Sequence, residues 1–420
     1  MRSASVRGNE SERIVSFDDA LGIVLAEAAR VGQQPTEPIS LGDSLGRVLA
    51  ASIVADRDHP PFDRSTRDGF AVRTKEAMEQ RWLSVAGQVQ AGRRWNSVPF
   101  REGQSIEIMT GAPVPPGADA VVMLEHVEQN GSAIRLQEGR SLAIGENIVI
   151  RGSEARSGDE VLAVGTELDA AAVAMAASCG VAIVEVFAQP TVAIVATGDE
   201  LVDLESAPGP EQIRNSNSYG LAALVKKAGG RAVRQPIAAD QRQAIEERIR
   251  SARTANLLLL SGGVSMGEYD LVESVLESLG AEFFFTGVKM QPGKPVVFGQ
   301  LPEREEMPAM YFFGLPGNPV STQVTFTCFV EPFLRAMRGA PIEGPRFMQA
   351  TLGDDVPAKA GLTRVLPARL TSTRQRAEVK LVTWQGSGDM AANARANCYA
   401  VLSEGRAGFK VDDVIPILLR

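Results

Sequence analysis

The feature that most constrains the fold is a regular alternation of apolar runs and helical stretches that starts at Thr191. The run NLLLL, residues 256–260, lacks polar alternation, which is typical of a parallel strand covered on both faces. Stretches with helical spacing separate such runs up to about residue 340. Repeated strand and helix predict a mostly parallel, doubly wound sheet with helices on both faces.

The rest of the chain has a different character. A length of 420 residues suggests roughly three domains at about 150 residues each. Ser16 is a plausible cap for a first helix. Residues 57–145 hold short strand-like runs between Pro and Gly turns, which predicts a β-rich module, and short strands after Pro345 predict a small all-β domain.

Composition excludes several classes of function. A net charge of -8 and a pI near 5.2 argue against a nucleic-acid scaffold. Three dispersed cysteines make a disulfide framework or a thiolate metal site improbable, and two histidines exclude most zinc-hydrolase designs. The polar N-terminus has no apolar signal segment and no apolar run reaches membrane-spanning length, so a cytoplasmic protein with no membrane association is expected.

Three loops follow predicted strands and therefore should face one crevice, because ligands of such sheets bind outside the carboxyl ends of the strands. The loops are TGDEL, SGGVSMGEYD and GLPGNPVS. Their candidate ligand-binding residues are Asp199, Glu200, Ser261, Gly262, Gly263, Ser265, Asp270, Pro316, Gly317, Asn318, Pro319 and Ser321. No GxxxxGK[ST] motif and no GxGxxG opening a βαβ unit is present, which excludes the ordinary nucleotide-binding loops.

These loops combine groups that suit an oxyanion with groups that suit a cation. The helix start at Asn318 and Pro319 offers a positive helix end, and Lys289 and Lys294 in VKMQPGKPV offer point charges. Carboxylates without His or Cys partners suit a hard cation such as Mg²⁺, which Asp240 could also bind. The alternative is that these carboxylates are helix caps or surface charges; Asp240, with Gln243 three residues on, fits a capping box equally well.

Ordered motifs along nearly the whole chain resemble the MoeA family of molybdopterin molybdenumtransferases, which includes the E domain of gephyrin. The motifs are PPFDRSTRDGFAV, IMTGAPVPPGADAVV, VATGDEL, IRNSNSYGL, SGGVSMGEYD, PGKPVVFG and FGLPGNPVS. SGGVS with its trailing Asp would alone match equally the single-domain molybdopterin-binding proteins of the MogA and MoaB type. The resemblance implies insertion of molybdenum from molybdate into adenylylated molybdopterin, with Mg²⁺-dependent release of AMP, in molybdenum cofactor biosynthesis.

The resemblance also implies a homodimer of four-domain α/β subunits. A discontinuous linker domain would combine residues 15–56 with 146–188 around the β-rich module of residues 57–145. The molybdopterin-binding α/β sandwich, of the MogA and MoaB type, would span residues 189–340, and a small C-terminal β-barrel would span residues 345–420.

The family's functional residues map onto named positions of this chain. The acidic set falls on Asp63, Glu200, Asp240 and Asp270, of which the last three are expected to hold Mg²⁺, while Asp63 is expected to reach the site of the partner subunit. Thr110 matches the family's threonine. Lys294 and the helix start at Pro319 are expected to bind molybdate, with Arg364 and Ser387 as weaker candidates.

Three positions depart from the family pattern. Gln291 stands where MKPGKP has a lysine, and Arg64 and Arg67 replace neutral residues in PFDNSAMDGYA. These changes bear on anion affinity rather than on the type of reaction. Two other functions stay open from the residues: adenylylation of molybdopterin with ATP, against which the additional domains argue, and a non-catalytic molybdopterin-binding scaffold, which would need no turnover and could recruit other cofactor-biosynthesis proteins.

Overall fold

The computed structural model describes residues 13–420 except 97–100, 263–270, 305–306 and 358. Two compact units account for the chain. Unit 1 comprises Met1–Pro38, Gly46–Ala50 and Glu185–Arg420, and unit 2 comprises Ile39–Leu45 and Ala51–Val184. Unit 2 therefore consists of two segments of the chain, each inserted between segments of unit 1.

The predicted doubly wound sheet forms in unit 1 with the strand order β17-β14-β18-β23-β22-β19. Strands β17, β14, β18 and β23 pair in parallel, whereas β22 pairs antiparallel with both β23 and β19. The strands are β14 (Thr191–Ala196), β17 (Arg231–Arg234), β18 (Leu257–Ser261), β19 (Glu282–Phe285), β22 (Val297–Leu301) and β23 (Met310–Leu315). The sheet is thus mostly parallel, as predicted. The sequence pattern places VKMQPGKPV in a Pro-Gly turn and omits the strand β22 that follows it.

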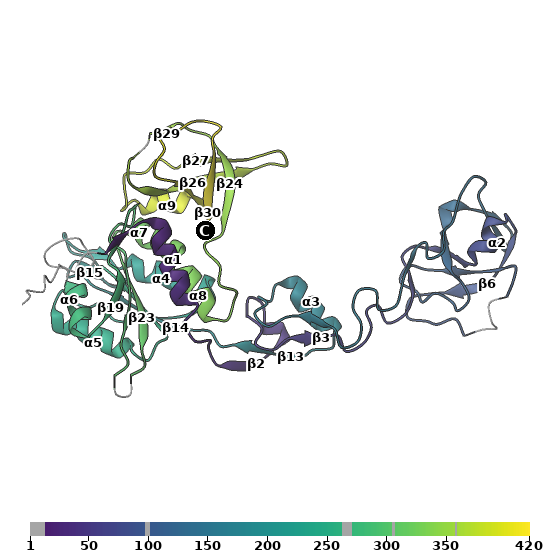
Figure 1. Ribbon diagram of the computed structural model, residues 1–420, viewed down its shortest axis with the longest axis horizontal. Helices are drawn as coiled ribbons and strands as arrows, with labels where there is room; N and C mark the ends of the chain where they lie inside the picture. Colours follow the sequence, from purple (N-terminus) through teal and green to yellow (C-terminus); the bar gives the residue numbers. More distant parts are fainter. Residues whose placement is uncertain (1–12, 97–100, 263–270, 305–306, 358) are drawn as a thin grey trace, which may run out of the picture. The chain divides into compact units, whose positions relative to one another are not determined.

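Helices cover both faces of this sheet (Figure 1). Leu257 and Leu259 belong to one core cluster and Leu258 and Leu260 to the other, and all four are 0% exposed. One face packs against α5 (Arg242–Ala252) and α6 (Leu271–Ser278), and the other against α1 (Phe17–Ala28), α4 (Ser216–Lys227), α7 (Pro319–Thr325) and α8 (Glu331–Met337). Burial on both sides explains why the leucine run has no polar alternation.

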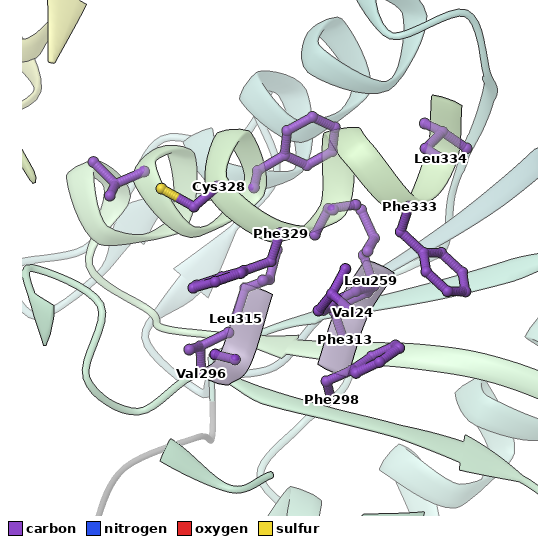
Figure 2. Packing of buried hydrophobic residues seen from close by; sticks show 14 of the residues in the cluster. Val24, Leu259, Val296, Phe298, Phe313, Leu315, Cys328, Phe329, Phe333 and Leu334 are labelled. Atoms are coloured by element: carbon purple, nitrogen blue, oxygen red, sulfur yellow. The ribbon is translucent and has the colours of Figure 1, made fainter. Parts of the chain in front are cut away.

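Phenylalanines fill the core beneath α1 and α8 (Figure 2). Phe298 stacks on Phe313 with ring centroids 4.3 Å apart and meets Phe333 edge-on at 5.4 Å. Phe17, at the start of α1, lies 5.6 Å from Phe329. The amphipathic period of α1 predicts that one face is buried but not which partner buries it. The structure places this helix in unit 1, whereas the linker domain implied by the resemblance would group it with residues 146–188, most of which belong to unit 2.

The stretch with helical spacing that starts at Pro319 and runs to Met337 is not a single α-helix. A π-helical segment, η3 (Phe326–Val330), separates α7 from α8. Thr325 and Thr327 donate their hydroxyls to the carbonyls of Ser321 and Gln323, four residues back, at 2.8 and 2.9 Å. Such bonds compete with the helical ladder, and Pro332 removes one N–H donor from it, so the local widening has an identifiable cause.

The C-terminal part of unit 1 is a closed five-strand barrel. Strands β26, β27, β24, β30 and β28 pair in that order, and β28 pairs back onto β26. The strands are β24 (Phe347–Leu352), β26 (Thr363–Ser372), β27 (Ala377–Leu381), β28 (Cys398–Leu402) and β30 (Val414–Leu419). The pattern past Pro345 predicts only strands, but a short helix, α9 (Met390–Arg395), also forms, capped by Asp389.

Unit 2 contains the predicted β-rich module. Its main sheet has the order β8-β5-β7-β6-β10-β9, with β6 and β7 parallel and the other pairs antiparallel. The strands are β5 (Gly69–Val72), β6 (Leu83–Val89), β7 (Gln104–Ile108), β8 (Ala120–Met123), β9 (Val127–Asn130) and β10 (Ala133–Leu136).

Outside that sheet, unit 2 pairs distant segments: β3 (Ile53–Val54) with β12 (Glu160–Leu162), and β4 (Arg64–Ser65) with β11 (Ile148–Val149). Unit 2 also contains the α-helices α2 (Thr74–Met78) and α3 (Ala170–Ser178) and the short 3₁₀ helices η1 (Leu41–Asp43) and η2 (Leu124–His126). The exact four-domain boundaries stay a prediction.

All three cysteines are free and buried, and no helix in the described part of the chain is long and apolar enough to span a membrane.

Candidate functional site

A cavity of about 870 Å³ opens in unit 1 where β14, β18 and β23 end. Backbone hydrogen bonds hold the loops that follow these strands: the Thr197 N–H donates to the Ser261 carbonyl at 3.0 Å, and the Gly262 N–H to the Leu315 carbonyl at 3.4 Å. Of the candidate residues in the predicted loops, those that line the cavity in the described structure are Glu200, Ser261, Gly262, Pro316, Gly317, Asn318 and Pro319. The crevice expected from strand order therefore exists.

Two carboxylates, Glu200 and Asp240, line the cavity. Asp199 does not line it; its carboxylate instead accepts the Asp240 N–H at 3.0 Å and so fixes the Asp240 backbone. The alternative that Asp240 caps the next helix is wrong, because Gln241 occupies that position. Asp240 is thus an exposed carboxylate beside the cavity with no helix to cap.

Gly262 lets the loop after β18 pass close to the loop after β14. Its φ is +96°, and a Cβ at this position would lie 2.4 Å from the Thr197 carbonyl oxygen. Only glycine combines that backbone conformation with so close an approach. The Thr197 hydroxyl, which belongs to a residue lining the cavity, is buried and has no hydrogen-bond partner among the described residues.

The GLPGNPVS turn starts α7 as predicted, with Asn318 at the N-cap position and Pro319 at the first helical position. The Asn318 side chain makes no capping bond. Ser321 is buried at 4% exposure and does not line the cavity, so the turn contributes through residues 316–319.

Asn217, near the start of α4, joins two of the loops. Its side-chain Nδ2 lies 3.0 Å from Ser261 Oγ, 2.7 Å from the Gly317 carbonyl and 3.3 Å from Thr322 Oγ1. The residue lies within the IRNSNSY motif, but the local sequence of that motif does not predict these hydrogen bonds, because each partner comes from a distant segment.

Arg214 is the only Lys or Arg among the described lining residues, against the two carboxylates Glu200 and Asp240. Lys294 is exposed and does not line the cavity, although the next residue, Pro295, does. A strongly anionic ligand would therefore meet a net negative lining. A cation shared between the carboxylates and the ligand resolves that conflict.

The barrel closes one side of the cavity through Gly388 and Met390. The neighbouring Ser387 carbonyl accepts the Val320 N–H of α7 at 3.0 Å, which ties the barrel to the helix start.

Gln291 and Arg364 are register partners in the short pairing of β21 (Met290–Gln291) with β26. Neither residue lines the cavity. Gln291 Oε1 and Arg364 Nε are both buried without a partner among the described residues, and burial lowers the pKa of Arg364. Unpaired buried polar groups are costly, so this pair is suited to receive a further polar group.

Asp63 and Thr110 belong to unit 2. Asp63 accepts the Arg151 N–H at 2.8 Å, and Arg64 forms an ion pair with Glu154. Thr110 donates its N–H and its hydroxyl to Asp68 at 2.6 and 2.8 Å, and these bonds lower the pKa of Asp68. Gly263, Ser265 and Asp270 lie outside the described residues.

The doubly wound sheet, the cavity at the ends of its strands and the C-terminal barrel together define a multidomain α/β ligand-binding protein. Three family models match it: the MoeA N-terminal region (domain I and II) over residues 15–180, a probable molybdopterin binding domain over 193–336, and the MoeA C-terminal region (domain IV) over 349–419.

Similar proteins include a molybdopterin molybdenumtransferase of Staphylococcus epidermidis, 33% identical over 91% of this chain and 90% of its own length. One from Staphylococcus aureus is 34% identical over 93% of each chain. The crystal structure of a molybdopterin biosynthesis moeA protein from Pyrococcus horikoshii has a TM-score of 0.78 and 29% identity, covering 97% of this chain and 100% of that one. The chain belongs to the MoeA family of molybdopterin molybdenumtransferases, enzymes of molybdenum cofactor biosynthesis, which confirms the family, fold class and enzyme class expected from the motifs.

Proposed function

We propose that this chain inserts molybdenum from molybdate into adenylylated molybdopterin and releases AMP, with Mg²⁺ bound at Glu200 and Asp240. The observation that carries the proposal is the meeting of two carboxylates with the Pro316–Pro319 turn in one cavity of about 870 Å³. This space suits a ligand of nucleotide and pterin size, since small-molecule pockets span roughly 300–1,000 Å³. The unpaired Thr197 hydroxyl supports the same conclusion, because a ligand would satisfy it.

The donor set fits a hard cation. Glu200 and Asp240 offer oxygen ligands only, which is the preference of Mg²⁺, and the missing coordination positions would be filled by water and phosphate oxygens. When bound, the cation would polarise the phosphate and stabilise the departing AMP. Asp199 would hold the Asp240 backbone in place, and the barrel residues Gly388 and Met390 would shield that side of the cavity from water. Asp270 is proposed as a further ligand on the family pattern alone.

Molybdate is proposed to bind near Lys294, the start of α7 and Arg364. The support is the buried Arg364 Nε–H, which has no partner among the described residues and is a donor that an oxyanion would satisfy. The neighbouring Gln291 carbonyl oxygen would repel an oxyanion, but turning the amide by 180° would present its NH₂ instead.

The test incubates the protein with adenylylated molybdopterin, molybdate and Mg²⁺ and measures AMP and active molybdenum cofactor. Glu200→Gln and Asp240→Asn should each lower AMP release at least a hundredfold, whereas Glu205→Gln, an exposed residue outside the lining, should not. Full rates in both lining variants would refute the metal assignment. Pyrophosphate release and formation of adenylylated molybdopterin from ATP and molybdopterin would instead indicate the preceding adenylylation step, and tight binding without turnover would indicate a scaffold.

A homodimer in the cytoplasm, with the partner subunit's Asp63 completing each site, belongs to the same proposal. Asp63→Asn and Glu200→Gln chains should each be inactive alone. Mixed after mild dissociation, they should regain about a quarter of wild-type activity, because half of the dimers are then heterodimers and each has one intact site. No recovery in verified heterodimers would refute the shared site.

A further inference from the structure

Three side chains of different chemistry converge in unit 2, outside the cavity described above: Asp56, His59 and Cys179. Their potential ligand atoms all lie within 4.8 Å of one another. His59 Nε2 is 3.8 Å from Cys179 Sγ and 3.7 Å from Asp56 Oδ1. The sequence hides this cluster, because Cys179 follows His59 by 120 residues.

The backbone holds the two less exposed members firmly. The His59 N–H donates to the Ala155 carbonyl at 2.7 Å, and the His59 carbonyl accepts the Glu154 N–H at 2.9 Å. Cys179 is the C-cap residue of α3 and is 6% exposed. The side chain of His59 is 13% exposed and that of Asp56 is 52% exposed. One side of the cluster is therefore open to water.

The contacts distinguish this cluster from a catalytic relay. In a nucleophile–histidine–carboxylate relay the nucleophile and the carboxylate bond to opposite ring nitrogens. Here the thiol and the carboxylate both approach Nε2. Three donor atoms around one point are the arrangement of a coordination centre.

The separations suit a small divalent cation. Zinc binds sulfur at about 2.3 Å and nitrogen or oxygen at about 2.0–2.2 Å, so tetrahedral ligand atoms lie roughly 3.3–3.6 Å apart. The separations of 3.7 and 3.8 Å from His59 Nε2 need only small side-chain movements, and the third separation, between Asp56 and Cys179, is at most 4.8 Å and would shorten as the side chains close on the ion. Three protein ligands with one solvent-facing position match a four-coordinate ion completed by water.

We propose that Asp56, His59 and Cys179 bind one borderline-soft divalent cation, with Zn²⁺ the best match to one sulfur, one nitrogen and one oxygen. Binding replaces the thiol proton of Cys179, which passes to solvent. The ion connects the segment after β3 to the end of α3 and so stabilises unit 2. The site is independent of Mg²⁺ at Glu200 and Asp240, and it runs against the expectation from cysteine and histidine counts that this chain has no thiolate metal site.

The experiment titrates metal-stripped, full-length protein with Co²⁺ in a phosphine reductant. We expect one equivalent to give visible bands of a four-coordinate ion and a thiolate-to-cobalt charge-transfer band in the near ultraviolet, both displaced by Zn²⁺. Cys179→Ala should abolish the charge-transfer band. His59→Gln should weaken Zn²⁺ binding more than about tenfold, the loss typical even for a group that only supports a metal ligand.

The other cysteines and the other histidine supply matched controls. Cys398→Ala and His126→Gln lie elsewhere and should leave the band and the Zn²⁺ affinity unchanged. Circular dichroism of each apo variant separates loss of binding from loss of folding, and Zn²⁺ should raise the midpoint of thermal unfolding of the wild type more than that of His59→Gln. Absence of a charge-transfer band in the wild type, or its persistence in Cys179→Ala, would overturn the proposal.

Discussion

Replacing Asn217 by alanine should loosen the wall of the cavity by a predictable amount. Three acceptors lie within reach of the Asn217 amide, on Ser261, Gly317 and Thr322. The amide has only two N–H donors, so at most two bonds form at once. At about 0.5–1.5 kcal/mol per bond, the loss is about 1–3 kcal/mol. For a unit of this size, 2 kcal/mol corresponds to a fall of about 4–8 °C in the melting temperature.

The assay can report unit 1 alone, because of the three tryptophans only Trp384 belongs to it. Replacing Trp82 and Trp95 by phenylalanine leaves Trp384, which packs against two core clusters of unit 1, as the fluorescent probe. Thermal unfolding of this background is then compared with and without the substitution. Asn217→Asp provides an isosteric variant without donors and should be at least as destabilised.

Ser216→Ala is the matched control, since Ser216 also lines the cavity and makes no side-chain hydrogen bond in the described structure. Its melting temperature should stay within about 1 °C of the background, as is usual for a surface change. AMP release should fall with Asn217→Ala and not with Ser216→Ala. Equal melting temperatures for all three proteins would show that the Asn217 contacts do not stabilise the loops.

Two further predictions concern the same unit. Burial and the hydrogen bond to Glu27 raise the pKa of Tyr311 to about 12 from 10.0. The protonated phenol therefore stabilises the fold fully below pH 10, and this stabilisation is lost as the pH rises through 12. Tyr311→Phe should flatten the fall of the melting temperature across that interval, and an unchanged slope would contradict this. Gly262→Ala should lower AMP release more than tenfold, because the added methyl group would clash with Thr197. The control is Gly361→Ala: its φ is +73° but no atom lies within 4 Å of the added Cβ, so it has only the cost of the backbone conformation and should retain activity. Equal activity in the two variants would refute the argument from close approach.

Periodicity predicted most of the architecture because burial leaves a direct mark on local sequence. The run from Leu257 to Leu260 lacks polar residues, and the structure buries it on both faces. Loops after such strands also cluster predictably, since parallel strands end at one edge of the sheet. This rule brought Glu200, Ser261 and Pro316 to one cavity without any knowledge of side-chain contacts.

What sequence could not provide is the choice of partner across long separations. The partners of Asn217 are 44 to 105 residues away, so the motif containing it reveals no hydrogen bond. The spacing of Asp240 and Gln243 predicts a capping box, but Gln241 is the N-cap residue and the helix starts at Arg242. The break at Phe326–Val330 depends on threonine side-chain bonds that compete with the helical ladder, a balance that spacing alone does not express.

The docking of α1 in unit 1 has a consequence for synthesis on the ribosome. Phe17 leaves the exit tunnel first, but its partner Phe329 is made about 300 residues later. At about 5–20 residues per second, the apolar face of this helix waits roughly 15–60 s for its place in the core. All of unit 2 is translated within that interval and is free to fold during it. The apolar face of this helix is therefore without its partner in the core for most of the elongation of the chain.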